Sequence, residues 1–199
     1  MNLHRRQFLG AVSCGVAGLY APRVFAEVTA GTRPALLDRA LASLDAHAGS
    51  IAHRDLMAVV DFSAPSRQPR LQLVDIEGGR VIETLLVAHG SGSDPANRGW
   101  VERFSNVEGS NASSPGAYVT GTTYVGKHGR SRRLRGLDME NSRAAERSIV
   151  IHGASYVSSG LASTTGRIGR SQGCFAVSQG SIAHVLAKLG DGRLLYAGK

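Results

Sequence analysis

The sequence predicts a single, mainly β domain of the α+β type, folded as a β-sandwich or a barrel-like sheet with a few helices. Short β-rich runs, bounded by Gly, Asn and Ser, recur along most of the chain. Only two segments place their apolar residues at helical spacing, and the sequence contains no internal repeat. With 199 residues, the chain is long enough for one domain with a substantial hydrophobic core.

The first 26 residues have the layout of a twin-arginine export signal. Arg5 and Arg6 directly precede an apolar run at 8–20, which is too short to anchor stably in a bilayer. Small residues follow, and we expect cleavage after Ala26. The sequence therefore predicts a periplasmic protein without stable membrane insertion, whose catalytic domain occupies residues 27–199.

The first predicted element of this domain is an amphipathic helix within residues 27–50. Thr32-Arg33-Pro34 is typical of a helix start, and the apolar residues from Leu36 to Leu44 recur at helical spacing until Gly49. Three β-rich runs follow, at 56–62, 71–76 and 81–88. A hairpin-like turn joins the last two, so we expect an antiparallel meander.

Residues 89–114 are rich in Gly, Ser and Asn and predict a long surface loop, with Trp100 placed in the core. The stretch between the two strands expected after it carries Lys127, Arg130, Arg132, Arg133 and Arg135, which predict a basic loop. A helix and a last strand complete the domain. These two strands, the helix and the last strand are expected at 117–125, 148–152, 178–189 and 193–197.

Charge and cysteine content limit the function. The formal net charge is +8, and removing the signal, which has three Lys and Arg and no acid, leaves +5. Such a surface favours an anionic partner such as the cell wall, and no motif supports nucleic-acid binding. Cys14 leaves with the signal, although it could alternatively mark a lipoprotein. Cys174 then remains unpaired, as a buried core residue, an intermolecular bridge or a nucleophile.

Two short segments concentrate the residues suited to nucleophilic catalysis. An apolar strand ends in His152-Gly153, and a glycine turn, Ser171-Gln172-Gly173-Cys174, follows after a gap of 17 residues. A thiol nucleophile needs a base for its proton, a group that holds the tautomer of that base, and amide donors for the oxyanion. His152 supplies the base, and Gly173 allows substrate to approach the backbone closely.

This pattern resembles the L,D-transpeptidase catalytic domain, whose motif is His-Gly, a gap, and then Ser/Thr-His-Gly-Cys. Further similar segments extend the resemblance over about 56–199, and they lie at 104–106, 113–116, 123–129 and 133–137. The resemblance implies a β-rich fold and a thioester intermediate formed on peptidoglycan stem peptides. It implies neither a metal nor an organic cofactor.

Carried over by position, the resemblance makes Cys174 the nucleophile and His152 its base, with the Gly153 carbonyl orienting the imidazole. Gly173 and Cys174 would donate amide hydrogen bonds to the oxyanion. Substrate contacts are expected from six further residues: Ser171, Gln172, Tyr124, Lys127, His128 and Tyr156. Two departures concern the donor pocket. Gln172 replaces the family's second histidine, and no arginine closely follows Cys174.

Several alternatives remain open at this stage. The same Cys-His site could hydrolyse stems as an L,D-carboxypeptidase or endopeptidase, and the linkage could be 3-3 or 1-3. A sortase would need an arginine on the strand after Cys174. A metalloenzyme would use four scattered histidines without metal-site spacing, namely His89, His128, His152 and His184. A non-catalytic wall-binding module predicts that Cys174 is buried and unreactive.

Overall fold

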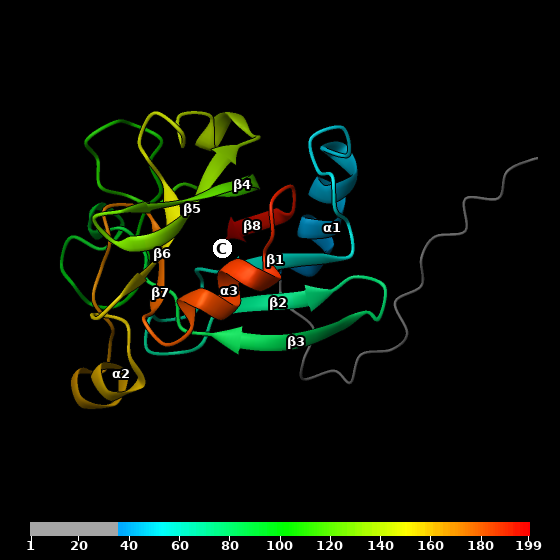
Figure 1. Ribbon diagram of the computed structural model, residues 1–199. Coiled ribbons are helices and arrows are strands. Elements are labelled where there is room, and N and C mark those ends of the chain that lie inside the picture. The colour runs from blue at the N-terminus through cyan, green and yellow to red at the C-terminus, as the bar shows by residue number, and fades with distance from the viewer. Residues whose placement is uncertain (1–35) are drawn as a thin grey trace, which may run out of the picture.

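Residues 36–199 are described by the computed structural model, and they form one eight-stranded mixed sheet with three α-helices (Figure 1). The strands are β1 (Leu56–Asp61), β2 (Leu71–Asp75), β3 (Arg80–Leu85), β4 (Gly116–Gly126), β5 (Gly129–Gly136), β6 (Val150–Ala154), β7 (Phe175–Ser178) and β8 (Leu194–Gly198). The helices are α1 (Leu37–Ala46), α2 (Ser159–Thr165) and α3 (Ile182–Lys188), with 3-10 turns η1 (Ser91–Ser93) and η2 (Met139–Asn141). The expected mainly β class is confirmed. The export signal and the helix start at 32–34 lie outside the described residues.

The sheet is curled, as its pairing shows. Its strand order is β3-β2-β1-β8-β4-β5-β6-β7, with parallel pairs at β1–β8 and β6–β7 and antiparallel pairs elsewhere. β3 and β7 therefore end the strand order. The chain after β3 nevertheless meets the chain of β7 through isolated bridges between Ala88 and Ala176 and between Gly90 and Ser171. These bridges bring the two ends of the sheet together in a barrel-like arrangement.

The larger core lies inside the curl. Phe62, Tyr118 and Phe175 are buried there, with ring centroids 6.1 Å apart for Phe62–Phe175 and 5.3 Å apart for Tyr118–Phe175. α3 contacts β5 and β6, and α1 packs on β4 and β8 over a second cluster (Figure 1). Burial of an aromatic ring contributes about 2 kcal/mol. Phe175 thus anchors the residue that directly precedes it, Cys174, to the core.

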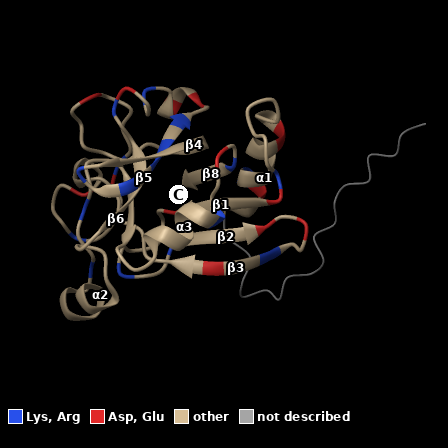
Figure 2. Ribbon diagram, viewed as in Figure 1, with Lys and Arg blue, Asp and Glu red and all other residues tan. Residues whose placement is uncertain are grey.

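The expected basic loop between two strands is wrong, because most of it forms β5. The strand pairs with β4 along Tyr118–Gly126 and with β6 at Arg132 and Arg133. Its outward arginines alternate with buried positions such as Leu134. Arg132 is buried as well, and its guanidinium donates to the carbonyls of Gly121 and Leu186. Figure 2 shows blue Lys and Arg stretches along β5.

Other expected features are also corrected. Trp100 is 44% exposed and does not belong to the core, whereas its neighbour Val101 is buried. The segment 89–114 is not wholly a surface loop, since it carries buried His89 and Asp94. The last helix begins at Ile182, because residue 178 still belongs to β7. Within residues 36–199, no helix is long and apolar enough to span a membrane.

Candidate active site

His152 lies on β6, and Cys174 directly precedes β7, the parallel neighbour of β6. His152 pairs with Ala176 across β6 and β7, and Cys174 stands two residues before Ala176. Directly opposed residues and residues two apart share a face of a sheet, so both side chains emerge on the same side. Standard strand spacings put their Cα atoms about 8 Å apart. A thiol and an imidazole can bridge such a separation, which makes them a candidate nucleophile and base.

The His152 imidazole is held in one tautomer. Its Nδ1 lies 3.0 Å from the Gly153 carbonyl oxygen, which can only accept, so Nδ1 carries the proton and Nε2 keeps a free lone pair. The side chain is only 2% exposed. Burial lowers the pKa of His152, the Gly153 carbonyl partly offsets this, and the charges of His128 and Lys127 add to the lowering. The ring is therefore a neutral base at neutral pH.

Cys174 is a half-buried free thiol. Its Sγ lies 3.6 Å from the Ser148 carbonyl, to which the thiol donates. Burial raises the pKa of Cys174, while a hydrogen bond with the Val150 backbone and the charges of Lys127 and Arg147 pull it down. A raised thiol pKa beside a lowered imidazole pKa favours the neutral pair. Proton transfer to His152 would then accompany attack by sulfur, instead of preceding it as a stable ion pair.

The turn before Cys174 is closely packed. Gly173 has φ +110°, and a Cβ there would come within 2.7 Å of the Ala112 carbonyl, so only glycine fits. The Gly173 N–H donates to Ser171 Oγ at 3.1 Å, and Ser171 Oγ donates to the Cys174 carbonyl at 2.7 Å. The Gly173 amide, expected to face an oxyanion, is thus engaged within the turn. This leaves the Cys174 N–H as the candidate oxyanion donor.

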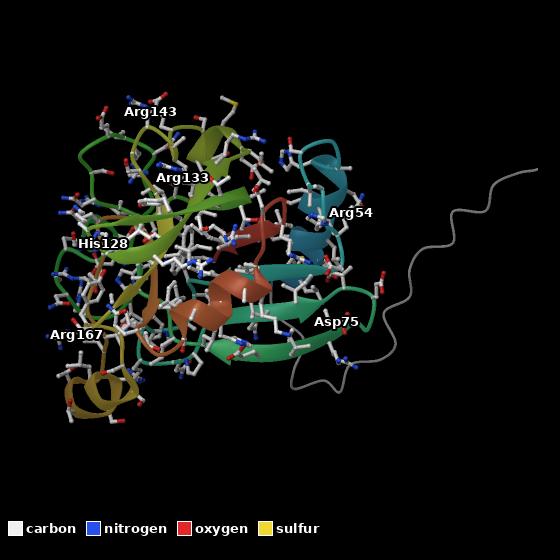
Figure 3. All side chains as sticks on the ribbon, in the orientation of Figure 1. Arg54, Asp75, His128, Arg133, Arg143 and Arg167 are labelled. Carbon is white, nitrogen blue, oxygen red and sulfur yellow. The ribbon has the colours of Figure 1, made fainter. Side chains whose placement is uncertain are left out.

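The expected substrate contacts divide into two groups. His128 stacks on His152 with ring centroids 4.2 Å apart, and the adjacent Lys127 acts electrostatically on both His152 and Cys174. Both residues are exposed at the turn between β4 and β5, and His128 is labelled there in Figure 3. They therefore cover the candidate pair from one side.

Tyr156, Gln172 and Tyr124 have different positions. Burial, followed by the neighbouring Cys174, raises the pKa of Tyr156 to about 12, which places this phenol near the thiol. Gln172 is exposed at the tip of the turn 171–174. Tyr124 packs under the Arg133 guanidinium, 4.5 Å from its ring centroid, and so belongs to the outer face of the hairpin. Of these three, Tyr156 is the one on which the Cys174 thiol acts electrostatically.

Arg147 is a site residue that sequence reasoning missed. Its guanidinium donates to Ser114 Oγ at 2.7 Å and to the Ser105 carbonyl at 2.8 Å, and it also reaches the Ala112 carbonyl. A Cβ on Gly173 would lie 3.2 Å from this guanidinium. Arg147 therefore holds the segment 105–114 next to the turn 171–174. No motif marks it, since its partners are backbone carbonyls and serine hydroxyls of a distant segment.

A buried network of side chains lies at the start of the segment 89–114. The guanidinium of Arg70 donates to His89 Nδ1 at 2.7 Å, and His89 Nε2 faces Asp94 Oδ2 at 3.3 Å. All three side chains are at most 2% exposed. Because Arg70 can only donate, the proton of His89 sits on Nε2 and points to the carboxylate. Burial, and then the charge of Arg70, lower the pKa of His89 to about 4.

The four histidines of the metalloenzyme alternative do not converge. His89 belongs to the network with Arg70, His128 stacks on His152, and His184 pairs with Glu83 at 2.7 Å. Among the described residues, no group of three or more His, Cys, Asp and Glu could hold a metal ion.

The buried network of Arg70, His89 and Asp94 predicts a loss of stability in mild acid. In the unfolded chain His89 titrates near its usual pKa of about 6.5, above its folded value of about 4, so the unfolded state binds the extra proton first. The contribution of His89 is complete above pH 6.5 and falls by about 3 kcal/mol as the pH drops toward 4. Urea unfolding between pH 7 and 4.5 measures this slope. The slope should be smaller in His89→Asn, and equal slopes in both proteins would contradict the prediction.

Comparison with known proteins identifies the family to which the chain belongs. A family model described as the L,D-transpeptidase catalytic domain matches residues 29–197, so the chain belongs to this family. Similar solved structures include an L,D-transpeptidase from Mycobacterium smegmatis, with 11% identity over 73% of this chain and 59% of that one, and a TM-score of 0.44. No curated protein matches the sequence.

Two further solved structures are similar to the chain. L,D-transpeptidase 3 from Mycobacterium tuberculosis, in complex with a faropenem-derived adduct, gives 11% identity, coverage of 73% and 60%, and a TM-score of 0.45. The L,D-transpeptidase from Xylanimonas cellulosilytica gives 16% identity, coverage of 79% and 68%, and a TM-score of 0.42. The chain thus spans about three-fifths of the length of the two mycobacterial structures.

Proposed function

We propose that the chain is a peptidoglycan L,D-transpeptidase that forms stem-peptide cross-links through a thioester on Cys174. The observation that carries this proposal is the place of Cys174, directly before β7 and beside His152 on β6, with Nε2 of His152 left free by the Gly153 carbonyl. Membership of the L,D-transpeptidase family supports the choice of stem peptides as substrate. The basic surface suits their carboxylates.

The first half-reaction forms the thioester. The thiol proton of Cys174 passes to Nε2 of His152 as sulfur attacks the carbonyl carbon of the donor amide. The Cys174 N–H donates to the oxyanion. Collapse of this intermediate breaks the C–N bond, and His152 returns the proton to the departing amine. In the second half-reaction an acceptor amine attacks the thioester carbonyl carbon and loses a proton to His152. The C–S bond then breaks, and His152 returns the proton to Sγ of Cys174, which regenerates the thiol.

Substrate contacts follow from the surroundings of this pair. Lys127 and His128, on the hairpin turn, are placed to bind a stem carboxylate close to the reacting bond. Tyr156 lines the site near the thiol, and Ser171 shapes the turn from below. Gln172 is exposed at the turn tip and can hydrogen-bond a stem amide. Tyr124 supports the hairpin through Arg133.

The linkage formed, 3-3 between diaminopimelates or 1-3 from L-Ala to diaminopimelate, is tested by mass spectrometry of muropeptides after incubation of purified protein with intact sacculi. New cross-linked dimers support the proposal. Shortened stems without dimers would instead identify an L,D-carboxypeptidase or endopeptidase. Unchanged sacculi, together with a Cys174 that resists alkylation at neutral pH, would leave a wall-binding module.

We also infer export through the twin-arginine pathway to the periplasm. The paired Arg5 and Arg6 before a short apolar run support it, and peptidoglycan lies in that compartment. Replacement of both arginines by Lys should retain the precursor inside the cell. Export of this variant at the normal rate would contradict the inference.

The proposed nucleophile predicts covalent labelling by a carbapenem. The strained β-lactam carbonyl offers Cys174 the electrophile that a stem amide would offer, and ring opening leaves one drug mass per chain. Intact-protein mass spectrometry after incubation with imipenem measures the adduct. We expect none in Cys174→Ala and slowed labelling in His152→Gln. Absence of an adduct on protein that turns over sacculi would contradict the prediction.

A further inference from the structure

The turn 171–174, called the nucleophile turn below, is hydrogen-bonded to the segment 89–94. The Ser171 N–H donates to the His89 carbonyl at 2.9 Å, and the Ser91 N–H donates to the Ser171 carbonyl at 2.8 Å. The guanidinium of Arg170 donates to the Asp94 carbonyl. Backbone and side chain thus tie residues 170 and 171 to both ends of this short segment.

The contact continues along the turn without a side chain between the two backbones. A Cβ built on Gly90 would come within 2.8 Å of both N and Cα of Gly173. The same Cβ would lie 2.2 Å from the Asn111 carbonyl oxygen, so Gly90 is packed on two sides. A shift of the segment 89–94 must therefore move the residue that directly precedes Cys174.

Ser171 passes this constraint on to Cys174. Its hydroxyl is 2.7 Å from the Cys174 carbonyl oxygen, and it accepts the Gly173 N–H at 3.1 Å. Ser171 is buried, so these hydrogen bonds are shielded from water.

The segment 89–94 is itself fixed from the core side by ionic groups. Arg70 donates to the Val87 carbonyl through Nε and Nη2, at 3.1 and 3.0 Å, and also to His89. Asp94 accepts the backbone N–H groups of Arg98 and Gly99, both at 2.8 Å. The ring of His89 joins the cation to the anion. A buried ionic network costs desolvation, but it allows one arrangement of its groups and specifies the backbone that carries them.

We infer that His89 is a positioning residue for Cys174. Linking Arg70 to Asp94, it fixes the segment 89–94, and through Ser171 and Gly173 it sets the place of the thiol relative to His152. The inference rests on the proposed role of Cys174 as nucleophile. It assigns no proton transfer to His89 itself.

Two near-isosteric variants separate the halves of this network. His89→Asn puts an amide oxygen near the Nδ1 position, which keeps an acceptor for Arg70 and removes the donor to Asp94. His89→Gln puts a donor near the Nε2 position and removes the acceptor for Arg70. In folded protein, we expect either change to lower kcat for a donor stem about tenfold or more, with KM within about threefold. The midpoint of the pH profile for Cys174 alkylation by iodoacetamide should also shift.

Matched variants exclude a merely structural effect. Thr120→Val, in β4, removes a buried hydroxyl that donates hydrogen bonds to the Gly190 and Arg193 carbonyls. This change should lower stability without shifting the pH profile of Cys174 alkylation. Ser171→Ala breaks the link to Cys174 outside the ionic network and should slow turnover like the His89 variants. If the His89 variants melt earlier but react as wild type does, or if Ser171→Ala reacts as wild type does, the inference is overturned. Alkylation needs no peptidoglycan, so a His89-dependent profile supports positioning even where sacculi remain unchanged and the proposed transpeptidase function fails.

Discussion

Replacement of Cys174 by Ala is expected to abolish turnover of sacculi and leave the fold intact. Cys174 is the only cysteine among residues 36–199, and it directly precedes β7, the parallel neighbour of the strand that carries His152. The small, half-buried side chain makes only weak hydrogen bonds, with the backbones of Ser148 and Val150, so alanine should cost only about 1 kcal/mol of stability. Muropeptide mass spectrometry and thermal melting measure the two effects.

A matched variant controls this experiment. Ser163→Ala on α2 removes an exposed hydroxyl whose hydrogen bond stays within its own helix, and it should leave the product spectrum unchanged. Cross-linking by Cys174→Ala within about tenfold of the wild-type rate would remove Cys174 from the chemistry, because loss of a covalent nucleophile costs several powers of ten.

The strands that could be predicted from the sequence are those with plain apolar patterns. β1, β2, β4 and β8 fall close to their expected ranges because their residues face a core on at least one side. β5 was missed because its solvent face is arginine-rich and one arginine, Arg132, is buried with its charge on backbone carbonyls. Composition cannot distinguish such a strand from a basic loop.

Two further elements carry too little local signal. β7 has only four residues, and its place is set by pairing with β6 across a gap in sequence. α2 is rich in Ser and Thr and buries none of its residues, so it lacks an apolar stripe to predict it. Figure 1 shows α2 standing away from the sheet. Tertiary pairing therefore decides β7, whereas α2 is bounded by local caps, with the Ser158 hydroxyl accepting the Leu161 N–H at its start and Gly166 in the left-handed region at its end.

The candidate site divides in the same way. His152 and Cys174 could be found because short motifs carry them and glycines flank both. Arg147 could not, because its partners lie far from it in the chain. The network of Arg70, His89 and Asp94 could not either, because no motif marks its members and Arg70 comes from a separate segment. The engaged amide of Gly173 likewise depends on the rotamer of a serine. Residues that support a nucleophile are defined by the folded backbone more than by spacing.

Replacement of His152 by Gln is expected to slow cross-linking nearly as much as loss of Cys174. Glutamine keeps hydrogen-bonding capacity but accepts no proton at neutral pH, and burial raises the pKa of the Cys174 thiol, so the thiol depends on a base. The loss should therefore be several powers of ten in kcat. His128→Gln is the matched control. It removes the stacked ring 4.2 Å away and should change KM more than kcat, because His128 is proposed to bind substrate.

The double variant decides whether thiol and imidazole share one step. If His152 only activates Cys174, removal of both groups should be no worse than removal of Cys174 alone, because each single change already eliminates the same proton transfer and attack. Residual rates of Cys174→Ala, His152→Gln and the double variant should then agree within about tenfold. A double variant far slower than Cys174→Ala would give His152 a separate role. Turnover by His152→Gln close to wild type would show that another group takes the thiol proton, and the exposed His128, which stacks on this ring, would be the first to test.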